Sequence, residues 1–339
     1  MNKPSIFKDS ETQNKFDRDG YVLIDLITGE EAEFIGKKFY EVYSDLPPGF
    51  FSAAFNPNEE IKEDIFKHTD LVFDKALNDV FHNFDKLGAT FLSKAPGKEG
   101  KVGVHQDWYV VDETCSYSAT IWVPMRDTDE TNGTLMVLPG SHLFFDTFRS
   151  NHIPLRYREH IELLWENMIT VPVKAGQAFV LNHAVIHASA PNISDKERLV
   201  MAYGVTPKGS SLVYYHQNDE GKVEKYNMPK DFFQRYFNIG QRPLIGELVQ
   251  TFNYPVPAAT LEEMHYLIAQ AKKISNSYSL ASLNAEKLFD DRGYIMLPPS
   301  LPKIWPLEAN KSTIKETASH TNSYTPLNLL RELKHKIFG

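Results

Sequence analysis

The chain has 339 residues, of which 42% are hydrophobic and 24% are charged, with a formal net charge of −8 at pH 7. This composition is ordinary for a globular protein, and the length allows one large domain or two modest ones. The negative charge and the lack of any basic stripe argue against a nucleic-acid partner. No run approaches the roughly 20 apolar residues that a membrane span needs.

The only cysteine is Cys115. It cannot form a disulfide within the chain, which fits a reducing compartment. We expect Cys115 to be a small buried side chain rather than a catalytic thiol. The first residues, MNKPSIFKDSETQ, lack the apolar segment of a signal peptide. We therefore expect a cytoplasmic protein that binds neither membranes nor nucleic acid.

The first part of the chain is predicted to be mainly helical. Residues 10–24 indicate a polar helix that runs into a strand at residues 20–24. Apolar residues at helical spacing predict two further helices, over residues 29–46 and 59–87. We expect these helices to form a buttress, residues 10–87, that supports the segment after it.

Short strand-like runs separated by turn residues fill residues 89–209. The runs are ATFLSKA, VGVHQDW, SATIWVPM, GTLMVLPG, ITVPVKAG, AFVLNHAVIHA and RLVMAYGVTP. Many short strands after a helical opening predict a mainly β fold with flanking helices, of the sandwich or jelly-roll type. The core of this jelly roll should cover about residues 89–210.

A non-strand insertion interrupts the β-rich part at residues 143–168, with a helical stretch near residues 156–165. Its length predicts a lid over the mouth of the barrel, and a packing elaboration without ligand contact is the alternative. Arg149, Arg156 and Arg158 lie within it. They suggest an anionic group on the substrate, or else form a solvated basic helix face.

The C-terminal third is less regular. Residues 227–275 are predicted to return to helices and loops, and they complete a first domain at residues 1–275. Residues 276–339 form an extension of unknown role, expected to dock on the main body or on a partner. Within it, residues 289–297 resemble residues 16–24, either as a remnant of duplication or by chance, and residues 326–338 could form a short helix.

Two histidines and an aspartate are candidate metal ligands. His105 and Asp107 lie two positions apart on an extended segment, so both side chains point to one face. His187, from a distant strand-like run, would complete a 2-His-1-carboxylate set of the kind that binds non-haem Fe(II). His183 shares the face of His187 and could compete with it, although the spacing to Arg198 favours His187. The alternative for His105 and Asp107 is a half-exposed edge strand.

A carboxylate clamp is predicted beside the metal. Arg198 lies one strand and one turn beyond His187, and its guanidinium could bind a carboxylate through two hydrogen bonds. Ser189 shares the face of His187 and could donate to the same carboxylate. A surface position for Arg198 is the alternative. Iron together with a bound oxoacid suggests an oxygenase that uses 2-oxoglutarate.

The ordered motifs of the chain resemble the phytanoyl-CoA dioxygenase family of Fe(II)/2-oxoglutarate oxygenases over about residues 12–210. The motifs that carry the resemblance are Phe16 with Gly20-Tyr21, His105-Gln106-Asp107, Ile121-Trp122-Val123-Pro124-Met125, Asn132-Gly133-Thr134-Leu135, Pro139-Gly140-Ser141-His142, Gly176-Gln177-Ala178-Phe179, His187-Ala188-Ser189-Ala190-Pro191-Asn192, and Arg198. Where the family often has an acidic residue after the glycine, this chain has Gln177, a turn position without expected chemical effect.

The resemblance implies a double-stranded β-helix of the cupin-like type. It also implies that His105, Asp107 and His187 bind iron, and that O₂ is the oxidant. It further implies a pocket that binds 2-oxoglutarate. The residues of this pocket would be Arg198, Ser189, Gln106, Trp122 and Thr90. The reaction would be hydroxylation through a ferryl and hydroxyl rebound, with succinate and CO₂ as products.

The identity of the substrate is open at this point. Related halogenases lack the carboxylate ligand, so the presence of Asp107 favours hydroxylation. We expect a small polar metabolite, such as an amino acid or a natural-product intermediate. An acyl group tethered to CoA or a carrier protein, a peptide substrate, and a non-catalytic metal-binding module remain as alternatives. The oligomeric state is not predicted.

Overall fold

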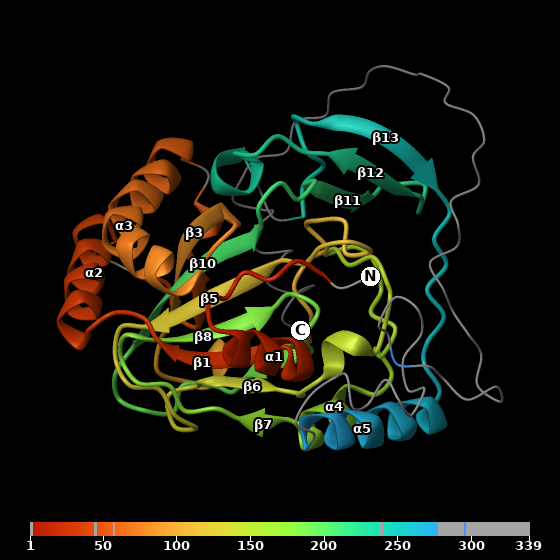
Figure 1. Ribbon diagram of the computed structural model, residues 1–339, viewed down its shortest axis with the longest axis horizontal. Helices are drawn as coiled ribbons and strands as arrows, with labels where there is room; N and C mark the ends of the chain where they lie inside the picture. Colours follow the sequence, from red (N-terminus) through yellow and green to blue (C-terminus); the bar gives the residue numbers. More distant parts are fainter. Residues whose placement is uncertain (1–2, 44–45, 57, 237–239, 277–294, 296–339) are drawn as a thin grey trace.

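The protein is described by a computed structural model that covers residues 3–43, 46–56, 58–236, 240–276 and 295. Two antiparallel sheets form its centre (Figure 1). The larger sheet has the order β1-β8-β5-β10-β3-β2 and the smaller one the order β4-β9-β6-β7. The strands of the larger sheet are β1 (Tyr21–Asp25), β2 (Phe50–Ser52), β3 (Phe84–Lys94), β5 (Ala119–Pro124), β8 (Gln177–Asn182) and β10 (Arg198–Pro207), and those of the smaller sheet are β4 (Val102–His105), β6 (Leu135–Val137), β7 (Ile169–Thr170) and β9 (His187–Ser189).

The eight strands from β3 to β10 form a double-stranded β-helix. Their order in the larger sheet is β8-β5-β10-β3, and in the smaller sheet β4-β9-β6-β7, so the chain crosses repeatedly between the sheets. Inward side chains of both sheets, among them Trp122, Phe179 and Val200 from the larger and Leu135 and Val137 from the smaller, form one buried cluster. This arrangement confirms the predicted jelly roll.

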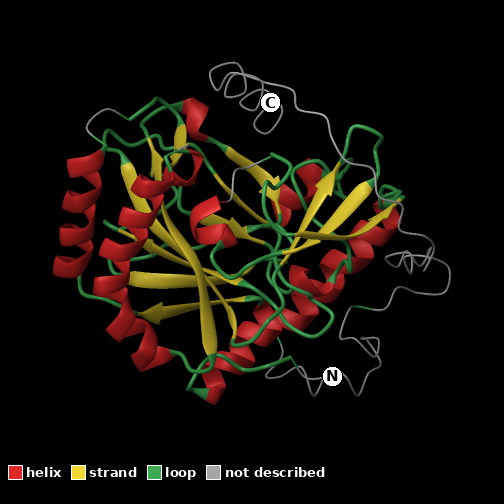
Figure 2. Ribbon diagram, turned by 90° about the horizontal axis from the view of Figure 1, so that it is seen from above, coloured by secondary structure: helices red, strands yellow, loops and turns green. Residues whose placement is uncertain are grey.

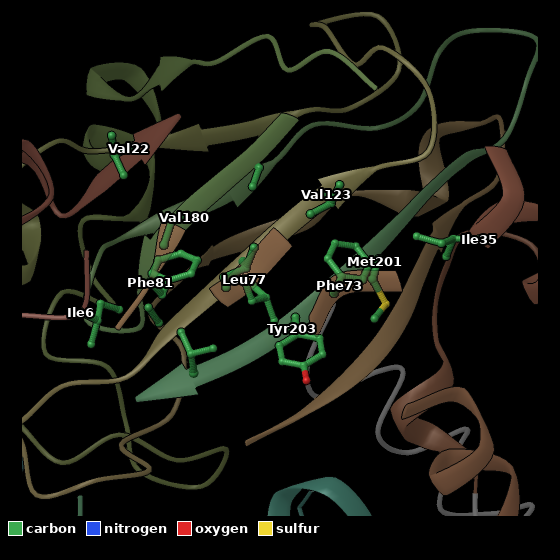
Figure 3. Packing of buried hydrophobic residues seen from close by; sticks show 14 of the residues in the cluster. Ile6, Val22, Ile35, Phe73, Leu77, Phe81, Val123, Val180, Met201 and Tyr203 are labelled. Carbon is green, nitrogen blue, oxygen red and sulfur yellow. The ribbon is translucent and has the colours of Figure 1, made fainter. Parts of the chain in front are cut away.

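Three helices cover the outer face of the larger sheet, namely α1 (Ser10–Asp19), α2 (Gly29–Val42) and α3 (Glu59–Val80). Residues of α2 and α3, such as Ile35 and Phe73, share a core with the outward side chains Val123, Met201 and Tyr203 of the sheet (Figure 3). These helices lie where the helical buttress was predicted. The predicted helix over 59–87 was too long, because Asn83 adopts a positive φ of 47° and residues 84–87 begin β3.

The insertion packs mainly on the outer face of the smaller sheet. Its helix α4 (Ile161–Asn167) and the later helix α5 (Leu261–Ser275) contribute Leu164, Met264 and Leu267 to a core with Ile186 and Ala188 of the β9 segment. Figure 1 shows α4 and α5 together below the smaller sheet. This part of the insertion is a packing element, and a role as a lid stays a prediction for the stretch before it.

A three-stranded antiparallel sheet follows the jelly roll. It consists of β11 (Val213–Gln217), β12 (Val223–Asn227) and β13 (Glu247–Phe252), in that order, next to a π-helical turn at Phe232–Tyr236. The expectation of only helices and loops for residues 227–275 was therefore wrong. The strands alternate polar and apolar residues only weakly, and Pro229 and Pro243 between them favoured a loop. Figure 2 shows this sheet beside the jelly roll.

Short 3₁₀ turns connect several of these elements, at Ala53–Phe55, Lys98–Gly100 and Ser141–Leu143. Beyond residue 276 the structure describes Ile295, whose buried side chain joins the core around α5 and whose N–H donates to the carbonyl of Leu143. The other residues of the predicted repeat at 289–297, and the predicted helix at 326–338, lie outside the described residues. One residue of the extension thus contacts the main body.

Two further expectations concern exposure. Cys115 is exposed, so the expected burial was wrong: it lies in a turn after Asp112 rather than on a strand. None of the helices that the structure describes combines the length and the apolar character needed to cross a lipid bilayer.

Candidate metal and oxoacid site

The three candidate metal ligands meet at the inner face of the smaller sheet. His105 ends β4, His187 begins β9, and the two residues are direct partners in the register of this strand pair. Asp107 follows two positions after His105. Its Oδ1 lies 3.9 Å from Nε2 of His105 and 3.9 Å from Nε2 of His187. All three ligand atoms lie within 4.8 Å of one another, so they could hold one metal ion.

Backbone carbonyls orient both imidazole rings. Nδ1 of His105 lies 2.8 Å from the carbonyl oxygen of Gly103, and Nδ1 of His187 lies 3.0 Å from that of Val185. A carbonyl oxygen can only accept, so Nδ1 carries the proton in each ring and Nε2 keeps a lone pair that faces Asp107. Burial, reinforced by the neighbouring His187, lowers the pKa of His105 to about 4. In both rings the Nδ1 contact with a backbone carbonyl thus leaves Nε2 available to bind a metal.

A polar chain lies behind the carboxylate of Asp107. The hydroxyl of Thr120 lies 3.5 Å from Oδ2 of Asp107 and 3.0 Å from Nε2 of His183, whose Nδ1 lies 2.8 Å from the hydroxyl of Ser118. Burial alone would raise the pKa of Asp107, but the surrounding imidazoles, His187 first, hold it below its usual value. His183 thus lies behind the ligand set and does not replace His187 in it.

A buried ion pair holds the backbone of the Asp107 loop. Nε of Arg149, from the insertion, donates to the carbonyl oxygen of Asp107 at 2.9 Å, and its two terminal nitrogens donate to the carboxylate of Glu113 at 2.5 and 3.0 Å. Arg156 pairs with buried Glu263 of α5. Both arginines are buried, so the alternative of a solvated helix face was wrong for them, and a role in binding an anionic substrate group stays a prediction. Arg158 is exposed and donates to backbone carbonyls of Leu155 and Val256.

The predicted clamp residues lie together inside the barrel. Arg198 is 1% exposed, and its guanidinium carbon lies 5.3 Å from the centre of the Trp122 ring. Nη1 of Arg198 and the hydroxyl of Ser189 both donate to the carbonyl oxygen of Gly133, at 2.8 and 2.7 Å. Nε of Arg198 is buried without a hydrogen-bond partner. Ser189 lies two positions after His187 on β9, so both side chains point to the same face of the strand.

The two remaining candidates are held by backbone groups. The side-chain amide of Gln106 donates to the carbonyl oxygen of Ala184 at 2.6 Å, and the hydroxyl of Thr90 accepts from the N–H of Ala54 at 2.8 Å. Thr90 and Trp122 lie on either side of Ala202 in the register of the larger sheet. Contact of Gln106 and Thr90 with 2-oxoglutarate stays a prediction.

The sequence reading missed Lys94, the last residue of β3. Lys94 is fully buried and faces Arg198 across the strand pair, while its Nζ donates to the hydroxyl of Ser189 at 2.5 Å. The sequence could have identified Lys94 from its spacing. It lies four positions after the predicted pocket residue Thr90, so on a strand both side chains point to the same face. We call Lys94, Ser189 and Arg198 the cationic seat.

The residues present fit both an iron ion and an oxoacid. Two imidazole nitrogens and one carboxylate are a donor set of non-haem Fe(II) sites. The cationic seat holds two buried basic side chains, and in the described part of the chain neither has a carboxylate within ion-pair distance. Unpaired buried charge is costly, so the seat and the orphaned Nε of Arg198 fit a ligand carboxylate.

Comparison with known proteins agrees with this geometry. A zebrafish (Danio rerio) phytanoyl-CoA dioxygenase domain-containing protein 1 is 29% identical over 130 residues, which cover 35% of this chain and 44% of the relative. A homologue from Dictyostelium discoideum is 25% identical over 184 residues, covering 51% and 60%. The matched parts thus span about two fifths to three fifths of these relatives.

Solved structures also resemble the chain. HygX from Streptomyces hygroscopicus, solved with nickel and 2-oxoglutarate, has 17% sequence identity and a TM-score of 0.44, with 59% of this chain and 88% of HygX covered. The sequence profile of phytanoyl-CoA dioxygenase (PhyH) matches residues 16–200. This is more than half of the chain, and it contains every residue of the candidate site. The chain therefore belongs to the phytanoyl-CoA dioxygenase family.

Proposed function

We propose that the protein is an Fe(II)- and 2-oxoglutarate-dependent hydroxylase. His105, Asp107 and His187 would hold the iron. The observation that carries the proposal is the convergence of two Nε2 lone pairs and one carboxylate oxygen, with both rings fixed by backbone carbonyls. Arg198 and Ser189 would bind the far carboxylate of 2-oxoglutarate, with Trp122, Thr90 and Gln106 around it.

The bound iron, 2-oxoglutarate and O₂ would supply the oxidising chemistry, with succinate and CO₂ as co-products. The side chains of the chain have supporting tasks. The Gly103 and Val185 carbonyls keep the imidazoles aligned, and Thr120 contacts the carboxylate oxygen of Asp107 that faces away from them. Arg149 fixes the backbone of Asp107. Because Asp107 supplies the third ligand, hydroxylation is proposed rather than halogenation.

The proposed substrate is a small polar metabolite, such as an amino acid or a natural-product intermediate. Arg149 and Arg156 are both paired with buried glutamates, which leaves Arg158 as the exposed arginine of the described insertion. This supports a substrate without the several phosphates of CoA. The relatives carry the name of phytanoyl-CoA dioxygenase, so an acyl-CoA is the alternative, followed by a carrier-tethered acyl group or a peptide. The cytoplasmic location stays a prediction.

The test combines binding and turnover. Anaerobic addition of Fe(II) and 2-oxoglutarate should give a visible charge-transfer band, and succinate release should rise with the true substrate in a panel of amino acids, acyl-CoA, acyl carriers and peptides. Asp107→Ala should abolish both the band and succinate release, because one of three ligands is lost. Asp219→Ala, at an exposed aspartate, is the matched control.

Two outcomes would contradict the proposal. Undiminished succinate release by Asp107→Ala would remove Asp107 from the ligand set. A wild-type band without substrate-stimulated succinate across the whole panel would favour the non-catalytic binding module.

A further inference from the structure

A buried histidine lies beside the metal ligands without being one of them. His183 follows β8 directly and is 8% exposed. Its Nδ1 lies 2.8 Å from the hydroxyl of Ser118, and its Nε2 lies 3.0 Å from the hydroxyl of Thr120. The Thr120 oxygen in turn lies 3.5 Å from Oδ2 of Asp107. The neighbouring strands β5 and β8 (Figure 1) thus carry a continuous row of polar groups that ends at a metal ligand.

The turn at residues 182–185, which carries this histidine, also contacts the other ligand segments. The carbonyl oxygen of Val185 lies 3.0 Å from Nδ1 of His187. The carbonyl oxygen of Ala184 accepts a hydrogen bond of 2.6 Å from the side-chain amide of Gln106, which lies between the two ligands of the first motif. One turn therefore supports every segment that supplies a metal ligand.

The carboxylate at the end of the row determines where each proton of the row lies. A carboxylate oxygen can only accept, so the hydroxyl of Thr120 donates to Asp107. The Thr120 oxygen then accepts from Nε2–H of His183, and Nδ1 of the neutral ring accepts from the hydroxyl of Ser118. Burial lowers the pKa of His183, which keeps this ring neutral near neutral pH. His183 therefore directs a proton toward the ligand set, whereas the two imidazole ligands direct lone pairs.

The two carboxylate oxygens of Asp107 have different surroundings. Oδ1 lies 3.9 Å from Nε2 of His105 and 3.9 Å from Nε2 of His187, so it points to the shared metal position. Oδ2 faces the hydroxyl of Thr120 instead. A carboxylate that bound iron through both oxygens would have to turn Oδ2 away from Thr120. It would then occupy one of the positions that this donor set leaves open for the oxoacid and O₂.

We propose that His183 is a positioning residue that acts through Thr120 and keeps Asp107 a metal ligand through Oδ1 alone. The imidazole orients the Thr120 hydroxyl as a donor, and the hydroxyl holds Oδ2 away from the metal. This arrangement keeps a position free for O₂ when the oxoacid is bound. The inference rests on the proposed function and names the residues that decide how many positions the iron site keeps open.

The experiment uses nitric oxide, which binds where O₂ would bind and allows no turnover. Anaerobic protein loaded with Fe(II) and 2-oxoglutarate is titrated with nitric oxide, and the EPR signal of the complex gives a dissociation constant. Thr120→Val replaces the hydroxyl by a methyl group of the same shape, so the second oxygen of Asp107 can reach the metal. This variant should bind nitric oxide about tenfold or more weakly, while its Fe(II) dissociation constant changes by less than about threefold.

Two control variants show whether the hydroxyl is responsible. Thr120→Ser retains the hydroxyl and should restore wild-type binding of nitric oxide. Thr251→Val makes the same substitution at an exposed threonine of β13 and should leave both dissociation constants unchanged.

Variants of His183 test the residue behind the hydroxyl. His183→Phe removes the N–H that orients Thr120 and should weaken nitric oxide binding in the same direction as Thr120→Val. His183→Gln keeps an amide donor and should retain most of the wild-type binding. Should the histidine variants not fold, Thr120→Val and Thr120→Ser still decide the outcome.

The inference and the proposed function fail in different ways. Wild-type affinity of Thr120→Val for nitric oxide would overturn the inference, and so would an equal loss of Fe(II) and nitric oxide binding in this variant. Wild-type affinity of a folded His183→Phe protein would overturn the role of His183. Absence of the charge-transfer band from wild-type protein with Fe(II) and 2-oxoglutarate would instead contradict the proposed function.

Discussion

The insertion and the cationic seat both bury arginine, but only the arginines of the insertion are paired with carboxylates. Arg149 lies against Glu113 and Arg156 against Glu263, with both members of each pair almost fully buried. In the seat, Arg198 faces Lys94 across the strand pair, and no carboxylate of the described residues pairs with it. The two regions thus differ in charge balance rather than in burial.

This difference separates structural charges from charges that await a ligand. The two charges of a buried ion pair compensate each other, and removing one residue leaves the charge of the other uncompensated. An uncompensated buried cation carries its cost in the free protein, and a bound anion relieves that cost. Mutation of arginine should therefore cost much more stability in the insertion than in the seat.

The largest effect on stability is expected at Arg149. Arg149→Met leaves Glu113 buried without a partner and removes the donor to the Asp107 carbonyl. We expect a loss of about 3–5 kcal/mol in the free energy of unfolding, measured by urea denaturation. Arg149→Met combined with Glu113→Gln should lose less, and Arg158→Met should change stability by under about 0.5 kcal/mol. A loss below about 1 kcal/mol for Arg149→Met would contradict the view that the ion pairs of the insertion stabilise the fold.

A smaller effect on stability is expected at Arg198, because its removal has two opposing consequences. Arg198→Met loses a bond to the Gly133 carbonyl and the contact with Trp122, but it also removes an uncompensated buried charge. The free protein should therefore change by less than about 1 kcal/mol. Added 2-oxoglutarate should stabilise wild-type protein against urea and should not stabilise the variant. A loss as large as that of Arg149→Met, without any ligand effect in wild type, would make Arg198 structural.

A pH dependence of the stability of the free protein is also expected to originate at Lys94. The pKa of Lys94 is lowered to about 6 by burial and then by Arg198, from an ordinary value of 10.5. Between these two values the unfolded chain holds the proton and the folded chain does not, so stability should rise with pH in this window. The slope is at most about 1.4 kcal/mol per pH unit.

Urea denaturation at pH 6.5 and 8.5, compared with Lys94→Met, isolates this contribution. The wild type should gain stability relative to the variant as the pH rises. Saturating 2-oxoglutarate should move the window upward, because a nearby carboxylate raises the pKa of Lys94. An identical pH dependence in both proteins would mean that Lys94 titrates normally.

Much of the fold and of the site could be predicted from local sequence patterns. Alternation on β9 places His187 and Ser189 on one strand face, and the same spacing predicted that Asp107, which follows the end of β4, lies with His105. Helical periodicity located α1, α2 and most of α3. The end of α3 was missed because the apolar spacing continues to Leu87, and only the turn at Asn83 shows where the helix stops. The strand β13 was missed because it pairs with β12 across a long connection that contains Pro229 and Pro243.

Other features were decided by contacts between distant segments. Arg149 and Arg156 look like solvated charges in the sequence, and their glutamate partners lie 36 and 107 positions away. Lys94 looks like the polar end of a strand until β10 places Arg198 beside it. No local pattern encodes such pairings, because the energy of a buried charge depends on which groups the folded chain brings within a few ångström.

By itself, the sequence determined which side chains can bind a metal and an oxoacid, since ligand chemistry and strand phase are local properties. The tertiary structure alone decided which charges are paired and which remain open to a ligand. The physical reason is that a buried charge is compensated well only by a partner in direct ion-pair or hydrogen-bond contact, and the fold decides which groups come into contact.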